Sequence, residues 1–139
     1  MNLQLGLNDP MGYLTYAGED YEFEDRLLAH VKIAMASKLR RNESFFLNWK
    51  ADPSAGMGRF SLWISPSIPL TFRFSGSRPP EMNQTWLEIM AEQSHTPGGL
   101  IIMTEAEAAQ IAQKRATANL PSHNELPPLT PAPSSPEEP

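Results

Sequence analysis

Residues 74–86, FSGSRPPEMNQTW, include the side chains and spacing best suited to holding an anion. An apolar strand that ends in Gly-Ser-Arg and leads into a helix binds phosphate in many proteins, because free backbone amides and the helix dipole attract negative charge. Two consecutive prolines, however, supply no amide proton before the helix. We therefore expect Gly76 to make the turn and the prolines to stiffen the passage. Arg78 stays a candidate contact for an anion, or an ion-pair partner for Glu81.

The three histidines do not form a recognisable catalytic set. His30 falls within a predicted helix, His95 at the end of another, and His123 in the C-terminal segment. A histidine base needs a positioned nucleophile and an orienting acid, and these positions predict neither. Acid–base catalysis therefore has little support.

An acidic run, Glu22, Glu24 and Asp25, precedes the first predicted helix. Carboxylates in this position cap the free amides of the first turn and interact with the helix dipole. We therefore expect Asp25 to be the N-cap and expect no metal site. No motif predicts a cofactor.

Basic residues spread over a helix and several strands give a sharper functional hypothesis. Phosphate contacts require cations at suitable spacing, and exposed aromatic rings can stack on bases. The candidate anion or nucleic-acid contacts are Lys32, Lys38, Arg40, Arg41, Arg59, Arg73 and Arg78, with the aromatic residues Trp49, Trp63 and Phe72 on strands. The same aromatic residues suit the core of a sheet, so both interpretations stay open.

Hydrophobic periodicity predicts the elements that would position these residues. GYLTYAGEDYEFED predicts a β-hairpin that turns at Gly18, and residues 25–43 predict a long helix with an apolar stripe. SFFLNWK, RFSLWIS and LTFRFS predict a three-stranded antiparallel meander. Asn83 predicts the N-cap of a second helix, and LIIM predicts a last strand. The expected fold class is α+β, in the order β-β-α-β-β-β-α-β.

The expected organisation is one compact domain over residues 11–103. The capping-box spacing of Thr104 and Glu107 predicts a weak helix over residues 104–118, whose apolar face is too thin to dock firmly. Residues 119–139 predict a disordered, acidic tail, because seven of the last twenty residues are proline.

Composition excludes several classes of function. The chain has 139 residues and no cysteine, which excludes disulfides, thiol catalysis and cysteine-ligated metal sites. No run approaches the roughly 20 apolar residues that span a bilayer. Residues 1–10, an N-terminal extension, lack the features of a signal peptide, so we expect a cytoplasmic protein. The net charge is −5, but residues 11–103 hold nine Lys or Arg against ten Asp or Glu, which neither favours nor excludes a nucleic-acid surface.

Four segments carry a family resemblance: MGYLTYAG, LLAHVKIAMASKLRRNESFFLNW, SLWISPSIPLTFRFSGSRPPEMNQTW and TPGGL. Together they resemble a family of small actinobacterial proteins with a domain of unknown function, many of which are labelled ATP-dependent DNA ligase. The resemblance covers nearly all of residues 11–103 and implies a shared fold. It implies no catalytic residues that can be transferred.

The ligase label leads to one candidate nucleophile, Lys50. Nucleotidyl-transferring ligases use the lysine of a Lys-x-Asp-Gly motif, whereas this chain has Lys50-Ala51-Asp52-Pro53. Proline in place of glycine removes backbone freedom, and residues 11–103 are too few to enclose ATP. We therefore expect a non-catalytic module that acts through a protein or nucleic-acid partner. The alternatives are a ligase-related or accessory protein of DNA repair, and a homo-oligomer joined through an exposed sheet edge.

Overall fold

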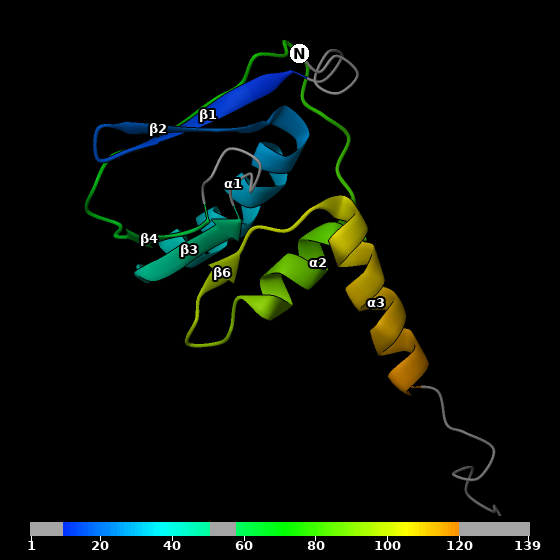
Figure 1. The fold of residues 1–139 in the computed structure, drawn as a ribbon. Coiled ribbons are helices and arrows are strands. Elements are labelled where there is room, and N and C mark those ends of the chain that lie inside the picture. Colours follow the sequence, from blue (N-terminus) through cyan, green and yellow to red (C-terminus); the bar gives the residue numbers. More distant parts are fainter. Residues whose placement is uncertain (1–9, 51–57, 120–139) are drawn as a thin grey trace, which may run out of the picture.

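The computed structural model describes residues 10–50 and 58–119, which form two three-stranded sheets and three helices (Figure 1). Their order is β1 (Met11–Tyr16), β2 (Glu19–Glu24), α1 (Asp25–Arg40), β3 (Phe45–Lys50), β4 (Arg59–Ile64), β5 (Leu70–Arg73), α2 (Gln84–Gln93), β6 (Leu100–Ile101) and α3 (Glu105–Asn119). The α+β class and the predicted order of elements are confirmed. The N-terminal extension and the disordered tail were predicted for segments that lie almost wholly outside the described residues.

The first sheet has the strand order β2-β1-β5, with both pairs antiparallel. A two-residue turn joins β1 to β2, and its residues Ala17 and Gly18 have φ angles of 52° and 86°. Turns with both central residues at positive φ match the twist of the flanking strands. The alternation of β1 then directs Leu14 and Tyr16 into the core, where Leu14 lies opposite Phe72 of β5.

The second sheet has the strand order β4-β3-β6, with β3 and β4 antiparallel and β6 parallel to β3. Its inner face buries Phe45, Leu47 and Ile64. The strand β6 has two residues, so it is shorter than the predicted LIIM strand. The Ile102 amide still donates to the Asn48 carbonyl at 2.8 Å, which continues the pairing with β3 by one bond.

The predicted meander is wrong in its last strand, because β5 pairs with β1 and not with β4. Pro66 and Pro69 lie between β4 and β5 and have no amide proton to donate to a ladder. The chain crosses to the first sheet at this point. The Ser65 amide donates to the Tyr16 hydroxyl at 2.7 Å, which fixes the crossing.

The core lies around α1, with the β1–β2 hairpin on one side and β3, β4 and β6 on the other (Figure 1). The α1 residues Leu28, Val31 and Met35 are fully buried. The helix α2 packs against α1 and β6 and buries Trp86 and Met90. Each such side chain stabilises the fold by about 1.5–3 kcal/mol relative to an exposed position.

The helix α3 docks on α2 more firmly than its alanine-rich sequence predicts. Ala108 is fully buried, and Arg115 forms an ion pair with Glu92 of α2. The predicted capping box is confirmed, since the Thr104 amide donates to Glu107 Oε1 at 2.9 Å and the Glu107 amide to Thr104 Oγ1 at 3.1 Å. The small side chain of Ala108 allows α3 to approach its neighbours closely. The ion pair between Arg115 and Glu92 supplies a contact that an apolar stripe on α3 would otherwise provide.

Candidate functional site

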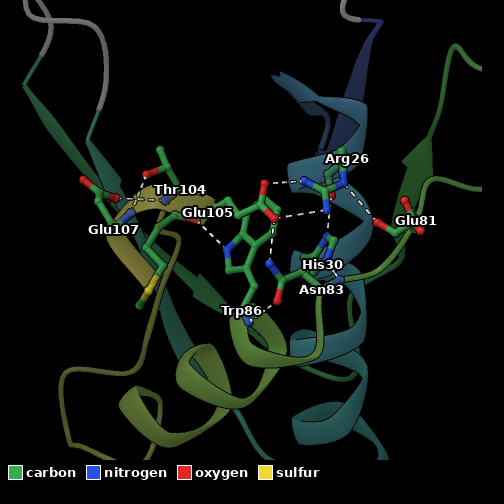
Figure 2. Close-up of polar contacts among 9 residues, drawn as sticks. Arg26, His30, Glu81, Asn83, Trp86, Thr104, Glu105 and Glu107 are labelled. Atoms are coloured by element: carbon green, nitrogen blue, oxygen red, sulfur yellow. Dashed lines mark hydrogen bonds and ion pairs between the residues drawn. The ribbon is translucent and has the colours of Figure 1, made fainter. Parts of the chain in front are cut away.

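The three helices meet at a polar junction formed by Arg26 and His30 of α1, Asn83 before α2, and Glu105 of α3 (Figure 2). The Arg26 guanidinium donates from Nη1 and Nη2 to the two carboxylate oxygens of Glu105, at 2.5 and 3.1 Å. Asn83 Nδ2 donates to Glu105 Oε2 at 2.6 Å. Asn83 Oδ1 accepts from the Trp86 amide at 3.1 Å, which confirms the predicted N-cap of α2.

His30 is fully buried within this junction and is held as the neutral imidazole. Its Nε2 accepts from the Asn83 amide at 2.9 Å, so Nδ1 carries the proton and donates to the Arg26 carbonyl at 2.8 Å. Burial lowers the pKa of His30, and the nearby Arg26 charge lowers it further. The ring stacks on Trp86 with centroids 4.0 Å apart.

Glu105 is the ionised partner of the junction. Hydrogen bonds from Arg26 and then from Asn83 lower the pKa of Glu105 to about 2. The Glu105 side chain is 42% exposed, so solvent screens its ion pair with Arg26. Because the polar atoms of the junction bind one another, we assign it a structural role in joining the helices and not a catalytic one.

The Ser75–Gly76 loop does bind an anion, and that anion is the side chain of Asp25. Asp25 Oδ1 accepts from the Ser75 amide at 3.2 Å, and Oδ2 accepts from the Gly76 amide at 2.8 Å. The prediction of Asp25 as the N-cap of α1 is wrong, because Glu24 holds that position without a side-chain cap. Asp25 is buried, and its carboxylate binds the amides of the Ser75–Gly76 loop and not those of its own helix.

Arg78, the other functional candidate of this loop, is exposed. In the described part of the chain it has no ion pair, and the expected partner Glu81 instead offers its backbone carbonyl to Arg26 Nε at 3.0 Å. The loop therefore holds no assembled anion site beyond the one filled by Asp25.

The outer face of the second sheet gathers aromatic, polar and basic side chains in one place. The strand alternation directs seven side chains outward, and we call this set the outer sheet face: Phe46, Asn48 and Lys50 of β3, Arg59, Ser61 and Trp63 of β4, and Ile101 of β6. In the register of the β3–β4 ladder, Phe46 lies opposite Trp63 and Lys50 lies opposite Arg59. The face thus has an aromatic end and a cationic end.

The aromatic end is an exposed ring pair. Phe46 and Trp63 are 41% and 53% exposed. Their ring centroids lie 4.9 Å apart, with an interplanar angle of 68°. Each ring thus has an edge or face available to a ligand, which is uncommon for two large aromatic side chains of a small domain.

The centre of the outer sheet face is a hydrogen-bonded pair, Asn48 and Ser61. Ser61 Oγ donates to Asn48 Oδ1 at 2.5 Å, and Asn48 Nδ2 donates to the carbonyls of Gly98 and Leu100 at 2.8 and 3.2 Å. These bonds hold the short β6 segment against β3. Gly99 has a φ of 95° and lies so close to the Phe46 backbone that a side chain would collide with it.

The cationic end opens into a groove beside α3. The groove has a volume of about 890 Å³, and its lining includes Lys50 and Arg59 on the sheet and Glu107, Gln110 and Ile111 on α3. Within the described residues neither Lys50 nor Arg59 has an ion pair or a side-chain hydrogen bond. Two like charges directly opposite each other repel, so this end is electrostatically suited to an anionic group.

The other basic candidates do not join this face. Lys38 is buried and lies 3.5 Å from Glu43, which also pairs with Arg41 at 2.9 Å. Arg73 lies on the first sheet, 3.9 Å from Asp20. Arg40 and Arg78 are exposed, on α1 and on the loop before α2. In the weak ligase-type motif, Lys50 is exposed, while Asp52 and Pro53 lie outside the described residues.

Of the aromatic candidates, Trp63 alone lies on the outer sheet face. Trp49 stacks on Phe60 at the inner face, with ring centroids 5.1 Å apart, and Phe72 is half-buried opposite Leu14. Phe46 was missed as a candidate. The alternation of the strand predicts its position, because Phe45 and Leu47 on either side of Phe46 face the core, and Phe46 must therefore face outward.

One comparison with known proteins gives a match. A family model for a domain of unknown function, DUF7882, matches residues 11–105, which is more than half of the chain. No match was found among curated proteins or among solved structures. None of the described helices is both long and apolar enough to cross a membrane. The chain belongs to the DUF7882 family of domains of unknown function.

Proposed function

We propose that this protein binds single-stranded nucleic acid on its outer sheet face. One observation carries the proposal: the exposed Phe46–Trp63 ring pair and the Lys50–Arg59 cation pair lie on the same side of the same two strands. Single-strand binding proteins combine stacking rings with cations that follow the phosphate backbone. The face offers both types of contact.

The spacing along the strands suits an extended ligand. Phe46 and Lys50 are four residues apart on β3, and a strand rises about 3.3 Å per residue, so the two ends are separated by roughly 13 Å. A short single strand can stack a base at one end and place a phosphate at the other. No carboxylate projects from the described strands onto this face, and Glu107, the acid in the groove lining, already accepts a hydrogen bond from the Thr104 amide.

Exposed rings also suit a protein partner, but the charges favour an anion. Lys50 and Arg59 lie directly opposite each other and repel. A phosphate between them would relieve that repulsion, whereas an apolar protein surface would bury both charges without a partner. The nucleic-acid ligand therefore accounts for both ends of the face.

Fluorescence anisotropy with labelled single-stranded DNA and RNA tests the proposal. We expect salt-sensitive binding, and the double variant Lys50→Ala/Arg59→Ala should reduce the slope of log K against log salt by about 0.7 for each cation. Phe46→Ala and Trp63→Ala should each cost about 1–3 kcal/mol of binding free energy, because each removes a stacking ring.

A matched control removes two cations from elsewhere on the surface. Lys32 and Arg73 lie away from the outer sheet face, near Phe74 and Tyr13. Lys32→Ala/Arg73→Ala makes the same change in net charge and should leave the affinity and the salt slope nearly unchanged. Absence of salt-sensitive binding, or equal losses in the two double variants, would contradict the proposed site.

A further inference from the structure

The strand β4 presents a row of backbone groups at an open sheet edge. In an antiparallel ladder, the amide and the carbonyl of one residue point to the same side. The Asn48 carbonyl accepts from the Ile102 amide, so the backbone amide and carbonyl of Asn48 point toward β6. Asn48 and Ser61 lie opposite each other in the β3–β4 ladder, and they are therefore a pair without backbone hydrogen bonds between them. The amide and carbonyl of Ser61 therefore point away from β3.

The same direction follows for every second residue of β4. With the period of two in a strand, Arg59 and Trp63 also direct their amides and carbonyls toward the edge. The Ser65 amide, two residues beyond Trp63, donates outward to Tyr16 Oη, in agreement with this assignment. In the described part of the chain, no hydrogen bond reaches the backbone groups of Arg59, Ser61 or Trp63 at this edge.

This edge has few of the features that prevent edge-to-edge pairing. Natural edges are shortened, bulged or interrupted by proline or by inward charges. The strand β4 instead has six residues, an unbroken register with β3 and no proline. Its one charge is Arg59, at the first position. The helices α2 and α3 lie toward β6, at the opposite edge of the sheet (Figure 1).

We propose that β4 pairs antiparallel with β4 of a second copy of this chain, about a two-fold axis at Ser61. In such a pair, a residue whose backbone amide and carbonyl face the edge must lie opposite a residue of the second copy whose amide and carbonyl also face the edge. Placing Ser61 opposite Ser61 of the second copy brings Arg59 opposite Trp63, and each of these pairs exchanges two backbone hydrogen bonds. A shift by two residues would place Arg59 opposite Ser65, whose amide is already bound to Tyr16.

The side chains agree with this register. Arg59 and Trp63 both lie on the outer sheet face, so a dimer places each guanidinium beside the indole of the other copy, where a cation is attracted to the ring. The two outer sheet faces join into one surface of a sheet with the order β6-β3-β4-β4-β3-β6. The pairing does not depend on nucleic-acid binding. Its consequence, a doubled binding surface, does rest on the proposed function.

The oligomeric state of the full chain without nucleic acid tests the pairing. Because one strand per copy is joined, we expect a monomer–dimer equilibrium that shifts toward dimer with protein concentration in sedimentation velocity. Ser61→Pro removes the amide that faces the edge and should give a monomer. Ser61→Ala loses the bond to Asn48 but keeps that amide, so it should still form dimers. A wild-type chain that stays monomeric, or a dimer unaffected by Ser61→Pro, overturns the proposal.

An introduced cysteine tests the register separately from stability, since the natural chain has none. Residues that exchange backbone hydrogen bonds across an antiparallel pair have Cα atoms about 5.5 Å apart, within the range for a disulfide. Ser61→Cys should therefore form a disulfide-linked dimer under mild oxidation. Thr71→Cys, exposed on β5 of the other sheet, is the control and should not. Equal cross-linking of the two variants overturns the register.

The outcomes separate this proposal from the proposed function. A dimer that binds no nucleic acid supports the pairing and contradicts the function. A monomer that binds nucleic acid does the reverse. If both hold, Ser61→Pro should weaken binding to long single strands by tenfold or more relative to Ser61→Ala, because both variants lack the hydroxyl and only the proline variant loses the avidity of the dimer.

Discussion

The Asp25 carboxylate accepts a hydrogen bond from the Gly76 amide at 2.8 Å and another from the Ser75 amide at 3.2 Å. A loop with the sequence features of a phosphate site is thus occupied by an anion of the same chain. The bond joins the start of α1 to the loop after β5, across about fifty positions of sequence. Asp25 therefore links two distant segments of the fold, and the Ser75–Gly76 loop is not the place where we expect a ligand to bind.

Asp25→Ala should destabilise the protein strongly. The substitution leaves two backbone amides without an acceptor in a partly buried place, and hydrogen bonds to a charged group contribute about 1.5–3 kcal/mol each. We expect the free energy of unfolding, measured by urea denaturation, to fall by about 3 kcal/mol. Asp20→Ala, at an exposed carboxylate of β2, should cost less than about 1 kcal/mol. Similar losses in the two variants would contradict the anchoring role.

Gly12→Ala should be destabilising for a steric reason. A Cβ atom at Gly12 would collide with the Arg73 carbonyl and would lie 2.6 Å from Asp25 Oδ1. Overpacking of this kind costs about 1–3 kcal/mol, and we expect the upper end because a backbone carbonyl cannot rotate away. Thermal unfolding measures the loss. Gly58→Ala provides the control, since a Cβ there meets nothing within 4 Å, and its melting temperature should not fall.

Local signals predicted the elements, and they did not predict the strand pairing. The period of α1, the N-cap at Asn83 and the capping box at Thr104 depend on residues within one turn of each other, and the structure confirms all three. The pairing of β5 depends on which strand has a free edge where β5 lies in the folded chain, and residues far away in the sequence determine this. The prolines between β4 and β5 cannot donate to a ladder, but nothing local to them predicts that the chain crosses to another sheet.

The same limit applies to the outer sheet face. Lys50 and Arg59 were both candidates, but only the register of β3 against β4 shows that they lie opposite each other. Phe46 follows the buried Phe45, and its exposure depends on what covers each side of the sheet. Asp25 has the spacing of a helix cap, and its actual partners lie on a segment that no local pattern connects to it.

The stability of the protein should fall as His30 becomes protonated. Burial lowers the pKa of His30 in the folded state, so the unfolded chain, with an ordinary pKa of about 6.5, binds the proton more readily. The stabilisation is complete above about pH 6.5 and is lost as the pH falls toward the folded pKa. Of the charged groups that face the ring, Arg26 opposes protonation and Glu105 favours it.

Urea unfolding between about pH 7 and pH 5 measures this dependence. His30→Gln removes the titrating group, so it should be less stable at neutral pH and show a flatter pH profile. His95→Gln, at an exposed position after α2, should keep the wild-type profile. A wild-type profile that is flat in this window, or a His30→Gln profile as steep as the wild type, would exclude the buried neutral histidine.

The ion pair between Arg26 and Glu105 should contribute stability in a lower pH window. Hydrogen bonds from Arg26 and Asn83 lower the pKa of Glu105 from 4.5 to about 2 in the folded state. The contribution is therefore complete above about pH 4.5 and is lost as the pH falls toward about 2. Because the carboxylate is 42% exposed, we expect at most about 1 kcal/mol, and less at high salt.

Comparison of the wild type with Glu105→Gln in urea unfolding isolates this contribution. The stability difference should be largest near neutral pH and should shrink as the pH is lowered through about 4 toward 2, because protonation of Glu105 removes the same charge in the wild type. Glu88→Gln, an exposed carboxylate of α2, is the control and should show little difference at any pH. A difference between wild type and Glu105→Gln that stays constant down to about pH 2 would mean that the carboxylate acts through its shape and hydrogen bonds and not through its charge.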